Sequence, residues 1–410
     1  MATADRPQMP KGTDRDRMQP TMVGESYTDR RSQELLKRYR GTRERRQKKA
    51  EQLAEASQYQ LMLAQFKKHR IATVSLYLLV ILYLMAIFAS FVVPYDTLQR
   101  FDQFGYAKPS QVHIVDANGN VHLPFIYGRT SKLDKKTFKY TFEEDTSKQY
   151  PVRLFVTGKP YDLLGVIPMS RHLFGVEGDQ PFFLLGADKL GRDLFSRIIY
   201  ASRVSLFIGF AGVIISFVLG IILGGISGYF GGVVDTVIQR IIEFIMSIPQ
   251  IPVWMALSAA IPKEWSGIQK FFAITLVLSF VGWTGLARVV RGKLISLREE
   301  DYVIAARISS AKPMQIIFRH LLPGVTSFLV VSITLAIPGM ILGETTLSFL
   351  GLGITAPDVS WGSLLQDAQD INAIANYPWL LAPVFFVMLA VVLFNFIGDG
   401  LRDAADPYSR

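Results

Sequence analysis

The sequence predicts an all-α polytopic membrane protein with six transmembrane helices and a small β-rich lobe inserted between the first two. Half of the 410 residues are hydrophobic and only 19% are charged, with a mean hydropathy of +0.26. This balance is rare in soluble proteins. A helix needs about 20 apolar residues to cross ~30 Å of hydrocarbon. Six runs meet this need, at residues 71–93, 204–226, 238–261, 271–287, 325–342 and 380–397.

The basic residues predict that both termini are cytoplasmic. The first 70 residues hold 17 Lys/Arg against 9 Asp/Glu, which gives most of the net charge of +10. Basic flanks of transmembrane helices stay in the cytoplasm. The segment after the fourth run is basic too, whereas residues 344–378 contain no Lys or Arg and suit the outside. The first run begins too far from Met1, and is too long, for a secretory signal peptide.

We divide the chain into four segments. Residues 1–70 form a basic cytoplasmic tail, disordered at first and then helical, because residues 1–30 are polar and contain three prolines. Residues 71–93 are the first transmembrane helix, 94–198 are extracytoplasmic, and 199–410 are a core with five more transmembrane helices. The tail could contact anionic membrane lipid, but we favour a solvated tail and expect no nucleic-acid partner.

The β-rich lobe is predicted from strand-like pieces within residues 94–198. These pieces lie at 112–115, 121–127, 138–142 and 152–156. Asn118-Gly119 stands between the first two, and this dipeptide between β-prone runs is typical of a hairpin turn. The sequence does not indicate what the lobe does.

The second apolar run carries a stripe of small residues. Their spacing of four places them on one helix face, which permits close contact with another helix. The stripe consists of Gly212, Ser216, Gly220, Gly224 and Gly228. Either a translocation interface whose helices move or tight static packing explains it.

The third run begins with an ionisable pair. Arg240 and Glu243 are three residues apart and therefore share a helix face. Charged residues in membranes often mark function, yet both lie near the cytoplasmic boundary, so we favour a structural ion pair over a substrate contact. Pro249 and Pro252 predict a kink further along this run.

The sequence excludes several chemistries. There is no cysteine, so disulfides, thiolate metal sites and cysteine nucleophiles are ruled out. No phosphate-binding Gly-x-x-x-x-Gly-Lys-Ser/Thr motif, His-Glu-x-x-His motif or Gly-x-Ser-x-Gly elbow occurs. We therefore expect a non-catalytic protein without cofactor or metal, and the energy for any transport must come from a partner.

The polar segment between the fourth and fifth runs points to a family. Ile304-Ala305-Ala306, Ser310, His320 and Leu322-Pro323 resemble the EAA loop of ABC-importer permeases, in which Glu, Gly and Ile stand where Ile304, Ser310 and His320 stand here. Residues 185–197, the first run and its flanks, and residues 398–407 resemble the same family. The match is closest to the C-type permease of oligopeptide/dipeptide importers.

The resemblance implies the type I ABC-importer permease fold in the inner membrane of a bacterium. It implies a homologous second permease, two cytoplasmic ATPases and an extracytoplasmic solute-binding protein as partners. The loop at 301–323 would be the ATPase-coupling site. Its candidate residues are Asp301, Tyr302, Ala305, Ala306, Arg307, Ser310, Leu322 and Pro323.

Glu344 and the substrate leave alternatives open. Glu344 is the only acid at the outer end of the fifth run, and it suits either an outer gate or docking role or a simple loop anchor.

Peptides or similar small solutes are the expected cargo. Permeases of this type also serve oligosaccharides, opines or nickel. A secondary transporter or channel without an ATPase, or an intramembrane enzyme, is the alternative class.

Overall fold

The computed structural model describes residues 58–116, 119–133 and 140–405. The chain divides into two compact units, Met1–Leu61 and Met62–Arg410. All elements below belong to the second unit except the start of α2 (Gln58–Phe66). The predictions for residues 1–57, for Asn118 and for the end of the 398–407 motif lie outside the described residues.

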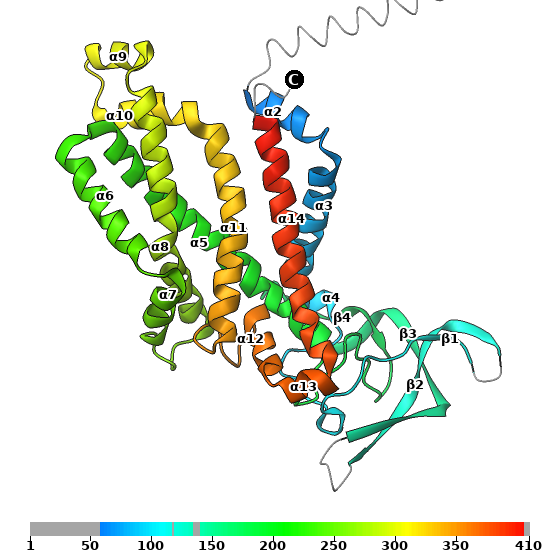
Figure 1. Ribbon diagram of the computed structural model, residues 1–410. Coiled ribbons are helices and arrows are strands. Elements are labelled where there is room, and N and C mark those ends of the chain that lie inside the picture. Colours follow the sequence, from blue (N-terminus) through cyan, green and yellow to red (C-terminus); the bar gives the residue numbers. More distant parts are fainter. Residues whose placement is uncertain (1–57, 117–118, 134–139, 406–410) are drawn as a thin grey trace, which may run out of the picture. The chain divides into compact units, whose positions relative to one another are not determined.

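Five helices of the described chain are long and apolar enough to span a membrane, as predicted. Three of these spans are α3 (Arg70–Ile87), α5 (Leu194–Phe230) and α8 (Gly267–Leu297). The other two contain α11 (Thr326–Phe349) and α14 (Ala382–Ala405). Helix α5 packs along α8 and α11, and α14 lies between α11 and α3 (Figure 1).

The third predicted span is a bent pair of helices rather than one rod. Helices α6 (Gly232–Ser247) and α7 (Gln250–Ala259) meet at 86°. Pro249 stands at the break as the N-cap of α7. Because proline has no backbone N–H and clashes with the preceding turn, it ends α6 there. The described residues therefore offer five candidate spans, or six if the bent pair crosses as one.

Capping side chains set where the long helices begin. Asp193 accepts a hydrogen bond from the Ser196 backbone N–H at 2.8 Å, so α5 starts ten residues before its apolar run. Ser266 and Gln269 form a reciprocal capping box at the start of α8. His69 Nδ1 accepts from the Ala72 N–H at 3.1 Å and caps α3.

The β-rich lobe predicted between the first two spans is present as a four-stranded antiparallel sheet in sequence order. Its strands are β1 (His113–Val115), β2 (Val121–Leu133), β3 (Tyr140–Leu163) and β4 (Ile167–Val176). The pairing of β1 with β2 confirms the predicted hairpin. The described part of the predicted piece at 138–142 and the whole piece at 152–156 lie in one 24-residue strand, and β4 was not predicted.

Short elements connect the spans. Helix α4 (Ala89–Val92) and the turn η1 (Asp102–Phe104) follow α3. Between α8 and α11 lie α9 (Asp301–Ile308), α10 (Pro313–Ile316), the π-helical turn η2 (Ile317–Leu321) and η3 (Leu322–Val325). Between α11 and α14 lie α12 (Trp361–Gln366), η4 (Asp367–Gln369), α13 (Ile371–Asn376) and η5 (Pro378–Leu381).

Candidate coupling site

The segment between α8 and α11 is a compact cap with its own hydrophobic core. It lies at one end of α5, α8 and α11, and the strands lie toward the other end (Figure 1). The buried members of this core come from α8, the cap and α11. They are Val290, Leu294, Val303, Ala306, Ile316, Ile317, Leu321, Val325 and Leu329. Phe217 and Ile221 of α5 pack against them, so the cap is attached to three spans at once.

The outer face of the cap exposes apolar side chains among charged ones. Ile304 and Ile308 are four residues apart on α9, and Ile308 is 80% exposed. Tyr302, Met314 and Phe318 are exposed as well. Of these residues, Tyr302, Ile304 and Ile308 lie between the candidate spans that end at Leu297 and begin at Pro313. Exposed apolar side chains at such a place are typical of a docking surface.

The predicted site residues divide between the two faces of the cap. Ala305 is exposed with Asp301, Arg307 and Pro323, whereas Ala306 is buried. The role of these residues in coupling stays a prediction, but Ala305 and Ala306 face opposite sides of α9. Ala306 contacts the chain's own core, and a charge there would disrupt the cap before it disturbed a partner.

Ser310 ends α9 in the left-handed conformation, with φ +62°. Its N–H donates to the Arg307 carbonyl at 3.0 Å, and the Ala311 N–H donates to the Ala306 carbonyl at 3.1 Å. These two bonds form a Schellman motif, in which glycine is the usual left-handed residue. The turn that the family pattern builds with glycine is thus made by serine.

The small-residue stripe of α5 lies against α8. A Cβ at Gly224 would stand 2.9 Å from Ala287 Cα, and one at Gly228 would stand 2.9 Å from the Arg291 carbonyl oxygen. At Gly220 the nearest atoms belong to Leu286, at 3.0 Å. The backbones of α5 and α8 are therefore so close that only glycine fits at these positions of α5.

The remaining stripe residues contact both neighbours of α5. Ser279 of α8 donates a hydrogen bond to the Gly212 carbonyl at 3.0 Å. A Cβ at Gly212 would be 3.5 Å from Met340 Sδ of α11, and Ser216 Oγ lies 3.5 Å from the Ser279 carbonyl oxygen. The contact between helices is therefore present, and both interpretations of the stripe, moving and static, require it.

A polar cluster joins α5, α6 and α8 close to the cap. The Asp235 carboxylate accepts two hydrogen bonds of 2.5 Å from the Arg291 guanidinium. Ser227 of α5 donates to the same carboxylate at 2.5 Å, and Gln239 donates to Ser227 at 3.0 Å. The Asp235 and Arg291 side chains are 17% and 29% exposed. This bidentate pair ties the bent helix pair to α8.

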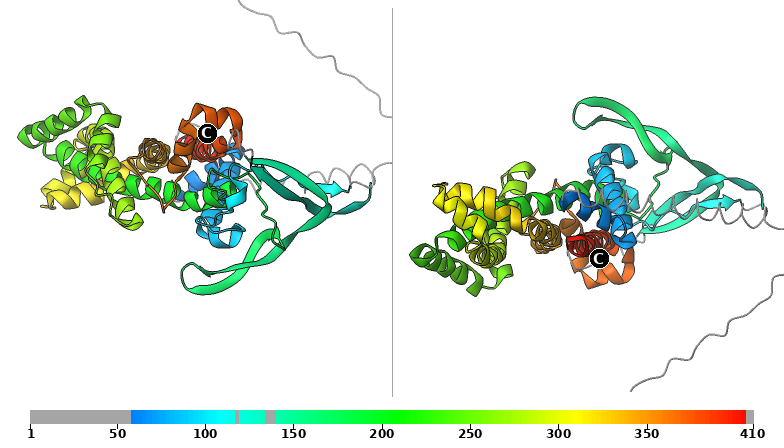
Figure 2. Two further views of the ribbon diagram at one scale, coloured as in Figure 1. Left: turned by 90° about the horizontal axis from the view of Figure 1, so that it is seen from below. Right: turned by 90° about the horizontal axis from the view of Figure 1, so that it is seen from above.

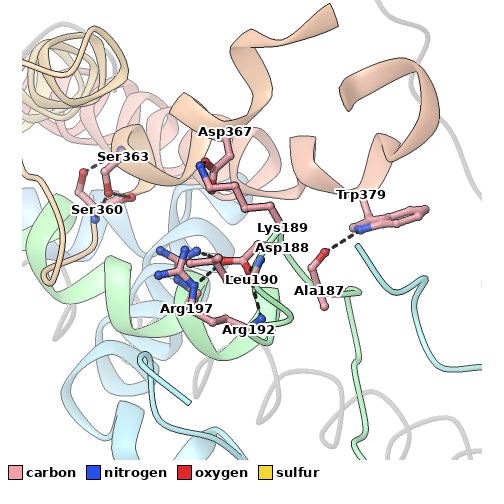
Figure 3. A network of polar contacts seen from close by, with 10 residues as sticks. All are labelled: Ala187, Asp188, Lys189, Leu190, Arg192, Arg197, Ser360, Ser363, Asp367 and Trp379. Atoms are coloured by element: carbon pink, nitrogen blue, oxygen red, sulfur yellow. Dashed lines mark hydrogen bonds and ion pairs between the residues drawn. The ribbon is translucent and has the colours of Figure 1, made fainter. Parts of the chain in front are cut away.

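A second carboxylate cluster fixes the opposite end of α5 (Figure 3). Asp188 accepts from the Arg192 Nε at 2.7 Å, and Arg197 donates to it as well. All three side chains are at most 10% exposed. Its neighbour Lys189 pairs with Asp367 at 2.8 Å, so the cluster is linked to η4.

The loop that carries Asp188 makes backbone contacts with the segment after α4. The Ala187 N–H donates to the Ala107 carbonyl at 2.9 Å, and the Tyr106 N–H donates to the Asp188 carbonyl at 2.9 Å. Burial raises the pKa of the adjacent Asp193 to about 7, although Ser196 donates to its carboxylate. The family-like sequence at 185–197 is therefore a structural junction.

Glu344 lies inside the protein rather than at its outer edge. Ser205 and Ser348 donate to its carboxylate at 2.9 and 2.6 Å, and the side chain is fully buried. The same Ser205 accepts from the Trp361 N–H at 3.1 Å. These contacts hold the 350–361 segment onto α5, as a loop anchor would, and the outer gate or docking role stays a prediction.

Arg240 and Glu243 form an ion pair of 2.7 Å on the exposed face of α6. Their side chains are 77% and 52% exposed in the isolated chain, so neither is buried between the helices of this chain. No group of three or more His, Asp or Glu that could hold a metal ion occurs among the described residues.

Residues 195–410 match the family model described as the binding-protein-dependent transport system inner membrane component. The chain belongs to this family. Residues 57–109 of the permease match a second model, the N-terminal TM domain of oligopeptide transport permease C. The two matches leave residues 110–194, which contain the whole β lobe, between them.

The permease is similar to several named transport proteins. It is 33% identical to the oligopeptide transport system permease protein OppC of Bacillus subtilis over 226 residues, 55% of this chain and 72% of that one. It is 39% identical to the dipeptide transport system permease protein DppC of the same organism, over 55% of this chain and 68% of that one. A chain of the inward-facing MetNI methionine ABC transporter aligns with a TM-score of 0.42 and 20% identity, covering 52% of this chain and 97% of that chain.

Two features of the permease site were not found by sequence reasoning. Asp235 and Arg291 are 56 residues apart, and nothing in a single sequence shows that they meet. Asp188 and Arg197 stand in the recognised 185–197 segment, but that resemblance gave them no role. An aspartate with arginines four and nine residues later was the available signal.

Proposed function

We propose that this permease subunit moves peptides, delivered by a solute-binding protein, into the cytoplasm, driven by ATPase subunits that dock on the cap at 301–323. The names of the relatives support peptides as the cargo, ahead of oligosaccharides, opines or nickel. In this proposal both termini and the cap are cytoplasmic, and residues 94–198 are extracytoplasmic. A homologous second permease completes the pore.

The observation that carries the proposal is the two-faced cap. Its outer face offers exposed apolar side chains such as Ile304 and Ile308, and its inner face is a core shared with three spans. A surface that only covered helix ends would not need exposed isoleucines at a water-facing end. A secondary transporter or channel would have no use for such a surface.

Force applied to the cap would reach the spans through packed contacts. Leu321 and Leu294 pack in the shared core, and Arg291, one turn before Leu294, binds Asp235 of α6. The glycine contacts of α5 with α8 follow from there. Because packed helices shift as units rather than bend, the residues of this chain transmit motion and line a path, and none performs covalent chemistry.

The docking proposal is tested by placing a charge on the exposed face. Ile308→Asp should bury an unpaired carboxylate at the ATPase contact, and substrate-stimulated ATPase activity of the reconstituted complex should fall at least about tenfold. Ala306→Asp is a poor test because its side chain is internal. The matched control is Leu123→Asp, at a leucine of the β lobe that is 79% exposed.

Stimulated activity should survive in the Leu123 variant. If Ile308→Asp also retained normal activity with the ATPases still bound, the cap would not be the coupling surface. Membrane insertion of each variant is checked by fluorescence-detected size exclusion, so a loss of activity is not confused with a loss of the protein.

Orientation has a clean test because the chain contains no cysteine. Leu123→Cys should react with a membrane-impermeant maleimide in intact spheroplasts, and Ile308→Cys only after lysis. Reaction of the Ile308 variant from outside would reverse the orientation and remove the cap from the ATPases. Ligand screening of the cognate binding protein would then decide between peptides and the other cargos.

A further inference from the structure

The tip of the β3–β4 hairpin is apolar and exposed. Leu164, Val166 and Ile167 are 53%, 77% and 50% exposed. Leu164 takes a left-handed φ of +54°, at a position where hairpins in water favour Gly, Asn or Asp. Leu164 also borders a pocket of about 430 Å³ that Ile87 of α3, Phe207 of α5 and Phe271 of α8 line as well. The exposed apolar tip therefore stands close to the ends of apolar spans.

The hairpin lies beside the end of the first span, and its tip faces α5 and α8 across the 430 Å³ pocket. It contacts α4, which directly continues α3, and Phe155 of β3 lies 6.3 Å from Phe91 between ring centroids. Viewed along the helices, the hairpin reaches sideways from them (Figure 2). The tip is therefore beside the end of a membrane span, where a bilayer has its interface.

An apolar pocket of about 520 Å³ separates the hairpin from the span. Ile81, Leu84 and Phe88 of the first span and its end form one wall, and Leu163 and Met169 of the hairpin form the other. All eight lining residues are apolar, the last three being Met85, Phe91 and Val92. The exposed apolar face of α3 continues directly into this pocket through Ile81 and Leu84.

We propose that the β3–β4 hairpin is a membrane anchor whose tip enters the bilayer interface, with lipid acyl chains filling the pocket between Met169 and Phe88. The occupant is the bilayer itself, because the pocket is lined by apolar residues alone and opens beside the exposed apolar face of a helix long enough to span a membrane. The anchor would fix the β lobe to the membrane at a set distance from the pore. It requires only that α3 spans the membrane, and it is independent of where the ATPases dock.

The backbone of the tip is suited to an environment poor in water. The Gly165 N–H donates to the Asp162 carbonyl, and the Val166 N–H donates to the Leu163 carbonyl, both at 3.2 Å. A turn that pairs its own amides can enter the interface without leaving them unsatisfied. Of the tip residues 162–168, only Asp162 is charged, and it stands at the end nearer the strands.

The test uses a pair of valines with the same exposure. Val166 at the tip and Val121 at the start of β2 are 77% and 75% exposed. Each is changed to Cys and labelled with bimane in the full-length permease, purified with its partner subunits into phosphatidylcholine nanodiscs. We expect brominated acyl chains to lower bimane emission at Val166→Cys roughly twofold or more, with little change at Val121→Cys.

Aqueous iodide should give the reverse order, quenching bimane at Val121→Cys more strongly. Equal quenching of both positions by brominated lipid, or stronger iodide quenching at the tip, would show that the hairpin is in water and overturn the proposal. Protection of the tip from iodide only after a solute-binding protein is added would assign it to a protein partner, which also overturns the proposal. Since neither valine is internal, both variants should fold.

Discussion

The two ends of α5 are each held by a carboxylate and guanidinium groups, but in different ways. At the first end, Asp188 binds Arg192 and Arg197, with all three side chains at most 10% exposed. At the second end, Asp235 binds Arg291, with 17% and 29% exposure. The first cluster joins residues at most nine positions apart, and the second joins residues 56 positions apart on α6 and α8.

The difference separates a fixed junction from a joint between elements. A buried cluster formed by one loop and the first turn of the helix that follows it has no arrangement to change to without leaving charges unpaired in the interior. A partly hydrated pair between two helices can lengthen or exchange with water at small cost. We therefore expect the Asp188 end to stay fixed and the Asp235 end, next to the cap, to take part in motion.

The largest effect is expected for Asp188→Asn. The change would leave the guanidinium groups of Arg192 and Arg197 buried without a counter-charge, at a cost of about 3–5 kcal/mol in unfolding free energy. Thermal unfolding of the purified complex in detergent, followed by tryptophan fluorescence, measures it. Glu243→Gln breaks an exposed ion pair and should cost no more than about 1 kcal/mol. Equal shifts for the two variants would contradict the distinction.

Compared with Asp188→Asn, Asp235→Asn should lower the free energy of unfolding less but reduce stimulated ATPase activity more. Hydration of the partly exposed pair limits the loss to about 1–3 kcal/mol, while stimulated ATPase activity should fall several-fold more than it does for Asp188→Asn at matched protein levels. A double-mutant cycle with Arg291→Gln checks that the pair itself is responsible. Additive single effects would show that the two residues act separately.

The spans were predictable and the long-range contacts were not. Apolar runs identify the helices because a bilayer requires about 20 apolar residues in a row, and Pro249 predicted a kink in the third span. The sharpness of the bend, 86°, depends on how α7 packs against α8. The burial of Ala306 and Glu344 likewise depends on which face of each helix meets the core, which their neighbours in sequence do not determine.

The stripe and the lobe show the same limit. The spacing of four residues predicted a glycine-rich face on α5, but only the structure shows that this face packs mainly against α8. In the lobe, Asn118-Gly119 predicted the first hairpin, whereas the second turn contains Leu164-Gly165-Val166 and lacks the usual polar turn residues. Its sequence did not predict a hairpin because apolar residues occupy the turn.

The close contact between α5 and α8 is tested by comparing two glycines, one on each helix. Gly224→Ala would place a Cβ 2.9 Å from Ala287 Cα and should destabilise the fold by about 1–3 kcal/mol. At Gly292 on α8 a Cβ would meet nothing within 4 Å, so Gly292→Ala should stabilise the helix by about 0.5–1 kcal/mol. The same unfolding assay measures both, and effects of the same sign would argue against close backbone contact.

The smallest expected effect concerns the left-handed turn that ends α9. Ser310 has φ +62°, while its neighbour Ser309 has φ −73°. A left-handed conformation costs a residue other than glycine about 1–2 kcal/mol, and Ser310→Gly removes this cost. Because glycine is more flexible in the unfolded chain, part of the gain is lost, and the turn should be stabilised by about 0.5–1 kcal/mol. Ser309→Gly should destabilise it by a similar amount, since its conformation needs no glycine. Hydrogen exchange of the Ser310 and Ala311 amides, which close the motif, reports the turn directly. Opposite changes in protection for the two neighbouring serines would assign the effect to backbone conformation, and matching changes would mean that the lost hydroxyl, rather than the left-handed φ, governs the turn.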